Sequence, residues 1–317
     1  MQLKIFKYGD IIKLITNAEV SAMKIFDMHV HAKNTPPKPE KLLEELGKAG
    51  VWGCSVISNR PKEMSADTGT DFDTRLKEIT EWTMGYGDRL IPILWIHPRE
   101  EGILEKIDIA ANAGVAAFKV ICNNFYVGEN KSMDMLEKIA ALGKPVMFHS
   151  GILWDGAPSS QYNHPERWEA LLELDGLRFS LAHCSWPWID ECIAVYGKFL
   201  NALASGKNVE MFVDLTPGTP EIYREELFKK LFTVGYDVPN NVMYGTDCRT
   251  DKYRFEWTKK WLGIDTALFD KFGIPQKMRE KIFYKNFMRF IGRSAESVTR
   301  FVPLPDSQTL WSPDLEK

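Results

Sequence analysis

The sequence predicts an α/β fold, a closed (β/α)8 TIM barrel that takes up most of the 317 residues. Short apolar runs rich in β-branched and aromatic residues alternate with amphipathic stretches, and eight such runs can be counted. Their starts lie about 30 residues apart, the length of one strand, one crossover helix and two loops. An open doubly wound sheet built from the same units is the alternative.

The eight apolar runs are the predicted strands. Because they are nearly continuous in apolar residues, both of their faces must be covered, as in a parallel sheet wrapped by helices. In chain order the predicted strands are residues 24–30, 52–57, 90–96, 115–121, 145–149, 177–183, 209–215 and 241–246.

Helix signals occupy the segments between the predicted strands. Residues 39–46 are amphipathic and lead into Gly47 and Gly50, and residues 132–139 lead into Gly143 in the same way. Glycine commonly follows the last turn of a helix because it adopts the left-handed conformation without a steric penalty. Each helix is followed closely by the next strand, as a repeated βα unit requires.

The chain is expected to form one domain. Residues 23–302 would contain a single barrel, with helices at 253–262 and 275–291 flanking it after the last strand. Residues 1–22 precede the first strand as an N-terminal extension, which either belongs to the native protein or results from an upstream start codon. Residues 303–317 are polar and contain proline, so we expect a surface tail.

The composition favours a small-molecule ligand. Apolar residues make up 44% of the chain, and the net charge of −3 gives no field that would attract nucleic acid or an anionic membrane. No apolar run approaches the roughly 20 residues that span a bilayer, and no signal peptide is recognisable. We therefore expect a cytoplasmic protein with a small-molecule substrate, no nucleic-acid partner and no membrane, and a homo-oligomer is compatible with the chain.

The cysteines agree with a reducing compartment. They are odd in number, form no CxxC pair and lack the density of a secreted disulfide scaffold. We interpret them as reduced, buried thiols; they are Cys54, Cys122, Cys184, Cys192 and Cys248.

Polar residues at strand ends are the main functional signal. Two histidines end the first predicted strand, one ends the fifth, one ends the sixth, and an aspartate follows the eighth. These residues are His29, His31, His149, His183 and Asp247. Residues two apart in a strand face the same side, and barrel active sites are built at the carboxyl ends of strands. Each signal is weak alone, but their joint placement predicts a metal site at one mouth of the barrel.

Four segments resemble the amidohydrolase superfamily, and within it the amidohydrolase-related (amidohydrolase 2) group, which contains metal-dependent hydrolases and decarboxylases. They are IFDMHVHA at the first strand, KPVMFHSG at the fifth, LRFSLAHCSWPW at the sixth and NVMYGTDC at the eighth. The resemblance covers residues 23–292 and implies a TIM barrel of the metallo-dependent hydrolase type. It is specific for the superfamily and not for a substrate.

The resemblance implies roles for the strand-end residues. In the family, the residues matching His29, His31, His149 and Asp247 bind the metal, and the one matching His183 orients or polarises substrate and water. Zinc favours imidazole nitrogens, so we expect one divalent metal, zinc in the first place, with manganese or iron able to occupy the same ligands. Asp247 would then take a proton from the activated water, and His183 would stabilise charge on the attacked carbonyl.

Lys119 is unusual because it interrupts a wholly apolar strand, where a lysine needs a partner or an exit to solvent. In binuclear members of the superfamily, a lysine on the fourth strand is carboxylated and bridges two metals, so the resemblance admits a second metal here. The alternative is an ammonium paired with Asp247 or with an anionic substrate.

Three loop residues are candidates for substrate binding. Arg60 and Arg249 both follow strand ends and could clamp a carboxylate bidentately. Trp154 lies in the loop after the fifth strand, where it could line a pocket. A surface position without a functional role is the alternative for each.

The expected function is a metal-dependent hydrolase that acts on a small amide, lactone or ester through a metal-activated water. The first alternative is a non-oxidative decarboxylase of a small aromatic or unsaturated acid, which the same family performs with the same ligands. An arginine that faces the metal, either Arg60 or Arg249, would favour the decarboxylase. The alternative of another class is a barrel that binds metal or ligand without catalysis.

Overall fold

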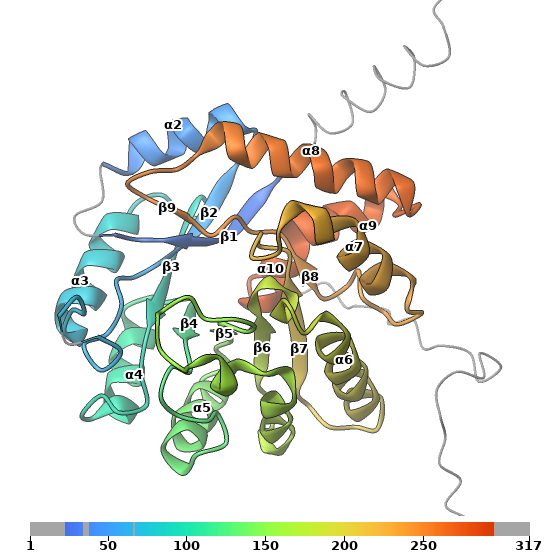
Figure 1. Cartoon of the computed structure of the whole chain (residues 1–317). Coiled ribbons are helices and arrows are strands. Elements are labelled where there is room, and N and C mark those ends of the chain that lie inside the picture. Colours follow the sequence, from blue (N-terminus) through green and yellow to red (C-terminus); the bar gives the residue numbers. More distant parts are fainter. Residues whose placement is uncertain (1–22, 34–37, 66, 295–317) are drawn as a thin grey trace, which may run out of the picture.

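The computed structural model describes residues 23–33, 38–65 and 67–294; the predicted extension 1–22 and the predicted tail 303–317 lie outside them. All the strands in these residues are parallel and belong to one curled sheet in the order β8-β7-β6-β5-β4-β3-β2-β1-β9 (Figure 1). Their bounds are β1 Phe26–His31, β2 Gly53–Ile57, β3 Leu90–Trp95, β4 Ala117–Val120, β5 Val146–Phe148, β6 Arg178–Leu181, β7 Glu210–Asp214, β8 Val242–Met243 and β9 Cys248–Arg249.

Helices alternate with the strands and cover the outer face of the sheet (Figure 1). The α-helices are α2 Pro39–Ala49, α3 Phe72–Thr83, α4 Ile103–Asn112, α5 Asn130–Ala141, α6 Ile189–Ala204, α7 Arg224–Thr233, α8 Phe255–Lys271, α9 Gln276–Glu280 and α10 Asn286–Phe290. The 3-10 helices are η1 Ser160–Asn163, η2 Pro165–Glu173, η3 Ala182–Ser185 and η4 Glu221–Tyr223, and η5 Lys281–Lys285 is a π turn.

The barrel is closed by the chain that follows β8. The predicted strand 241–246 is shorter than expected: it is interrupted after β8 and resumes as β9, which pairs with β1. Between them, the N–H of Met28 donates to the carbonyl of Tyr244 (3.0 Å), and the N–H of Asp247 donates to the carbonyl of His29 (2.8 Å). The last part of the sheet therefore lies beside the first, and the predicted (β/α)8 fold is confirmed.

Two segments between and after the strands differ from a regular βα repeat. The connection between β5 and β6 is built from η1 and η2 instead of an α-helix. The helix predicted at 275–291 starts after Pro275, but η5 divides it into α9 and α10. A π turn adds a residue and shifts which side chains face inward. After it, Phe287 stacks on Phe26 at a ring separation of 4.9 Å, so this segment covers the amino-terminal end of the barrel.

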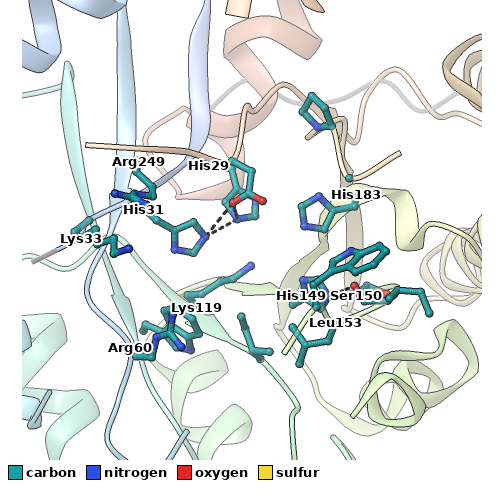
Figure 2. A pocket seen from close by; sticks show the side chains of 18 of the residues that line it. His29, His31, Lys33, Arg60, Lys119, His149, Ser150, Leu153, His183 and Arg249 are labelled. Atoms are coloured by element: carbon teal, nitrogen blue, oxygen red, sulfur yellow. Dashed lines mark hydrogen bonds and ion pairs between the residues drawn. The ribbon is translucent and has the colours of Figure 1, made fainter. Parts of the chain in front are cut away.

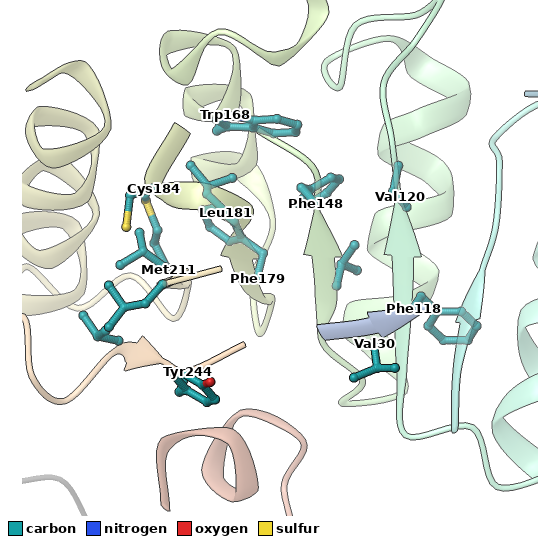
Figure 3. Packing of buried hydrophobic residues seen from close by; sticks show 14 of the residues in the cluster. Val30, Phe118, Val120, Phe148, Trp168, Phe179, Leu181, Cys184, Met211 and Tyr244 are labelled. Atoms are coloured by element: carbon teal, nitrogen blue, oxygen red, sulfur yellow. The ribbon is translucent and has the colours of Figure 1, made fainter. Parts of the chain in front are cut away.

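The core has two layers. The larger one lies between the strands and the helices, where Phe118, Phe148 and Leu181 point outward (Figure 3). The smaller one fills the barrel below the strand ends; its members from the strands include Phe26, Met28, Ile91, Ile93, Ala117, Met147, Phe212 and Met243. All five cysteines are buried free thiols, as predicted. The end of the barrel at the carboxyl ends of the strands is occupied by polar side chains.

A β-bulge in β1 changes which residues face inward. The pairing of β1 with β2 shifts register between Asp27 and Val30. Within the shifted segment, Met28 belongs to the barrel interior and His29 lines the pocket above it, and after the shift His31 lines the pocket as well. Regular alternation would place Met28 and His29 on opposite faces, whereas a bulge lets both face the barrel axis.

Candidate active site

One large pocket lies at the carboxyl ends of the strands and has a volume of about 820 Å³ (Figure 2). It is lined by side chains from β1, β3, β4 and β9 and from segments that follow other strands. The structure brings together here all nine residues to which the sequence analysis gave a role: His29, His31, Arg60, Lys119, His149, Trp154, His183, Asp247 and Arg249. Their roles remain predictions at this point.

Three of these residues present ligand atoms to one point. Nε2 of His29 lies 3.1 Å from Nε2 of His31, and Oδ1 of Asp247 lies 3.3 Å from His31 Nε2 and 3.8 Å from His29 Nε2. Among the described residues, they form the one group of three or more histidine, cysteine or acidic side chains whose ligand atoms all lie within 4.8 Å of one another. Two imidazoles and one carboxylate suit zinc, manganese or iron.

Asp247 reaches the two histidines because the strand is broken at this residue. Its φ is 59°, a left-handed conformation that is uncommon outside glycine, and its N–H bond to the His29 carbonyl holds it there. The side chain is 42% exposed. Partial loss of solvent favours the neutral carboxyl, but the hydrogen bond with His31 and the charge interactions with the imidazoles outweigh this and hold the pKa of Asp247 well below its usual range. The carboxylate is therefore ionised at neutral pH.

His29 is held as a neutral imidazole with a defined proton position. Its Nδ1 lies 3.1 Å from Oδ2 of Asp214, and burial, reinforced by the charge of Lys119, lowers the pKa of His29 to about 4. Burial alone would raise the pKa of Asp214, but the hydrogen bond and charge interaction with His29, followed by the charge interaction with His183, hold it well below its usual range, so Asp214 is an ionised acceptor. Nδ1 of His29 must then carry the proton, and Nε2 offers its lone pair to His31 and Asp247. Lone pairs and negative charge that converge in this way fit a bound cation.

His149 and His183 lie on the other side of the pocket (Figure 2). Their ring centroids are 5.3 Å apart, and His183 is 5.6 Å from His29. Nε2 of His149 lies 3.2 Å from the carbonyl of Ile152, which can only accept, so Nε2 is protonated and Nδ1 is the atom free to bind a ligand. Burial and then the neighbouring His183 lower the pKa of His149 well below its usual range. His149 is outside the close group of three, and its place among the ligands stays a prediction.

Lys119 extends from β4 into the same pocket (Figure 2). Burial lowers its pKa to about 8, although Asp214 and Asp247 oppose this effect. The ammonium forms no direct ion pair with any described residue, so the pairing with Asp247 that was one alternative is not seen. A pKa of about 8 leaves part of the amine uncharged near neutral pH, and the uncharged amine is the form that reacts with carbon dioxide.

The three predicted substrate-binding residues lie at the pocket mouth but differ in their surroundings. The guanidinium of Arg249 is bonded to the carboxylate of Asp251, with a distance of 2.9 Å from Nε to Oδ1. Arg60 is exposed, and its side chain pairs with no carboxylate in the described part of the chain. Trp154 is 80% exposed. Of the two arginines, Arg60 is thus the one whose charge is available to a ligand.

Sequence reasoning missed residues that support the site. Asp214 ends β7 and contacts His29, and Thr216 follows it and contacts His183 (2.9 Å from Oγ1 to Nδ1). Asp214 carried the same signal as the chosen residues, an acid at the end of an apolar strand. Trp95 ends β3, and its ring packs at 5.6 Å from that of His31. Its type is common in cores, so nothing in the sequence distinguished it.

Comparisons with known proteins agree with this architecture. Among solved structures, the chain is similar to a probable 2-pyrone-4,6-dicarboxylic acid hydrolase from Acinetobacter baumannii (12% identity, TM-score 0.56, covering 85% of this chain and 100% of that one). It is also similar to 2,6-dihydroxybenzoate decarboxylase from Rhizobium (12%, 0.57, 85% and 98%) and to amidohydrolase 2 from Bifidobacterium longum subsp. infantis (16%, 0.52, 86% and 100%). At these identities the likeness concerns the fold. No curated protein matches the sequence significantly.

Within the described residues, no helix is long and apolar enough to cross a membrane.

The family is shown by the sequence itself. The family model for amidohydrolase matches residues 55–293, which is most of the chain. This family includes hydrolases and decarboxylases, and its superfamily binds divalent metals in a barrel of the kind described above. The chain therefore belongs to the amidohydrolase 2 family of enzymes.

Proposed function

We propose that the protein is a metal-dependent hydrolase of a small amide, lactone or ester. The observation that carries this proposal is the convergence of His29, His31 and Asp247 within one deep pocket that His149 and His183 also line. The first three would hold one divalent metal, with His149 offering Nδ1 as a fourth ligand, and zinc is the metal that their chemistry favours. When bound, the metal supplies Lewis acidity that activates water at neutral pH.

The side chains around the metal position divide the acid-base work. Asp247 is ionised and partly open to the pocket, so it can accept the proton of the attacking water and return it to the leaving group. His183 lies opposite His29 across the pocket, where it can stabilise charge on a substrate carbonyl. The pocket is large enough for a small organic substrate.

A second candidate is non-oxidative decarboxylation of a small aromatic or unsaturated acid. The specific observation in its favour is Arg60, which lines the pocket without a carboxylate partner and can bind a carboxylate substrate. Arg249, whose guanidinium is already engaged by Asp251, supports it less. One similar structure is a decarboxylase, and the probable 2-pyrone-4,6-dicarboxylic acid hydrolase was crystallised with citric acid bound, but both are only distant in sequence.

A substrate screen on the metal-loaded protein separates these candidates. The protein would be loaded with zinc or manganese, its metal content measured, and a panel of small amides, lactones, esters and aromatic acids tested for hydrolysis and for release of carbon dioxide. Hydrolysis that is lost on chelation supports the first proposal, and carbon dioxide release that is lost in Arg60→Ala supports the second.

His183→Asn tests the catalytic role assigned to His183. We expect this variant to bind metal like the parent and to lose turnover, because His183 is assigned to the substrate and not to the metal. A variant that keeps both its metal and full activity contradicts the role of His183. A metal-loaded parent that turns over no member of the panel points to the non-catalytic alternative.

A further inference from the structure

Asp214 is a buried carboxylate that links two parts of the site. It ends β7, its side chain is 1% exposed, and its two oxygens serve different partners. Oδ2 bonds Nδ1 of His29 from β1 at 3.1 Å. Oδ1 accepts the backbone N–H of His183 at 2.8 Å, the backbone N–H of Thr216 at 3.1 Å and the hydroxyl of Thr216. One side chain thus connects β1, the turn η3 that follows β6, and the loop after β7.

The hydroxyl of Thr216 extends this link to the ring of His183. A hydroxyl has a single proton, and Thr216 donates it to Oδ1 of Asp214, the oxygen that also accepts the backbone N–H groups of His183 and Thr216. Thr216 Oγ1 lies 2.9 Å from Nδ1 of His183, so it must accept a proton from that nitrogen. His183 is therefore held as the Nδ1–H tautomer, and its Nε2 remains free for a substrate or water.

The backbone around His183 needs such an anchor. The residues from His183 to Ser185 have φ values of 60°, 44° and 57°, a run of left-handed conformations without a glycine. Residues of this kind cost free energy and persist only where the surroundings hold them. The carboxylate of Asp214 receives the N–H of the first of them, which fixes the turn that presents the imidazole.

Close packing keeps the link in place. A Cβ on Gly245 would lie 2.6 Å from Cγ2 of Thr216 and 2.9 Å from Cβ of His29. Thr216 and His29 therefore leave no room for a side chain at position 245. Gly245, in the chain between β8 and β9, packs closely against both Thr216 and the base of His29.

We propose that Asp214 is a positioning residue that couples His29 to His183: it orients His29 toward the metal and holds the turn at His183 directly, and it sets the ring tautomer of His183 through Thr216. This inference rests on the proposed function for its catalytic meaning. Its geometry, which joins the two halves of the site through one carboxylate, can be tested without a known substrate.

The test compares Asp214→Asn, Thr216→Val and Thr216→Ser with Asp265→Asn as the control. Asp265 is equally buried and pairs with Arg224, which also bonds the carbonyl of Leu215, but neither side chain lines the pocket, so its variant reports the general effect of removing a buried charge near Asp214. Two quantities are measured on the full chain: zinc affinity by competition with a chromophoric chelator, and the ring tautomers of His29 and His183 from ¹⁵N spectra of histidine-labelled protein.

We expect Asp214→Asn to weaken zinc binding about 10-fold to 100-fold, the usual effect of losing a partner of a metal-ligating histidine. Thr216→Val should leave zinc affinity nearly unchanged but remove the single Nδ1–H form of His183, and Thr216→Ser should restore that form. Asp265→Asn should lower the melting temperature without changing either readout.

Three results would overturn the inference. They are unchanged zinc affinity and tautomers in Asp214→Asn, an equal loss of zinc affinity in Asp265→Asn, and an unchanged His183 tautomer in Thr216→Val. If the parent binds no zinc, the proposed function fails, and the tautomers in the metal-free protein then decide the inference alone. If Asp214→Asn does not fold, the two Thr216 variants decide it.

Discussion

The ring of His183 packs directly against the backbone of Gly218, so a single added methyl group tests how tightly the site is built. A Cβ at Gly218 would lie 2.7 Å from Cγ, 2.8 Å from Cβ and 2.9 Å from Nδ1 of His183. These atoms belong to the base of the side chain and not to a flexible end. Rotation about χ1 would relieve the contact by taking Nδ1 away from Thr216.

The expected cost of Gly218→Ala follows from these contacts. Overpacking a well-filled site costs about 1–3 kcal/mol, and loss of the bond between Nδ1 of His183 and Thr216 adds about 1 kcal/mol. We therefore expect the free energy of unfolding to fall by about 2–4 kcal/mol. Displacement of the imidazole by about 1 Å should also lower turnover by about 100-fold once a substrate is known.

Urea unfolding followed by circular dichroism measures the first effect. The matched control is Gly263→Ala in the interior of α8, where a Cβ would meet nothing within 4 Å. That change should raise stability by up to about 1 kcal/mol, because alanine is the better helix former. A Gly218→Ala protein that matches the parent in stability and in the ¹⁵N signals of His183 would show that this packing does not hold the ring.

Four further outcomes are expected. His29→Ala should lower the bound metal well below one ion per chain in elemental analysis, and an unchanged metal content would contradict the ligand assignment. With added bicarbonate, a second metal that appears in the parent and is absent in Lys119→Ala would support the carboxylated bridge, whereas a single metal in both would remove it. Asp265→Ala should destabilise the fold by about 3–5 kcal/mol in urea, because it leaves the guanidinium of Arg224 buried and unpaired. Burial lowers the pKa of His97 from 6.5 to about 4, so between these pH values the unfolded chain takes up a proton that the folded chain does not. The free energy of unfolding should therefore fall by at most about 3 kcal/mol as the pH decreases through this range. His97→Gln should flatten the dependence of the melting temperature on pH in this range, and an unchanged slope would refute the assignment.

The barrel was predictable because its signals are local. Each predicted strand overlaps an observed one, since buried parallel strands show as short apolar runs whatever surrounds them. The split of the last strand was not predictable, because it depends on the left-handed conformation of Asp247 and on its bond to the His29 carbonyl. The π turn η5 in the last predicted helix was likewise not predictable, because hydrophobic periodicity does not record it.

The candidate site also has features that the sequence predicts and features that depend on how the strands pair. His29 and His31 could be placed at the pocket because they end an apolar strand, but the bulge that turns His29 inward is a matter of pairing between β1 and β2. Asp214 stood at a strand end and could have been chosen. Its importance is visible only when β1, β6 and β7 are brought together, because its partners are 31 and 185 residues away in the chain.

The pocket also explains why the family can be recognised while the reaction stays open. Its deep part is made by strand ends, where His29, His31 and Asp247 are fixed by backbone bonds and by buried carboxylates that the fold itself supplies. Its mouth is made by loops, where Arg60 and Trp154 are exposed. On the proposed function, the deep part would hold the metal for either hydrolysis or decarboxylation, and the groups at the mouth that meet the substrate would decide between the two reactions. The mouth is therefore the part of the molecule on which a search for the substrate should concentrate.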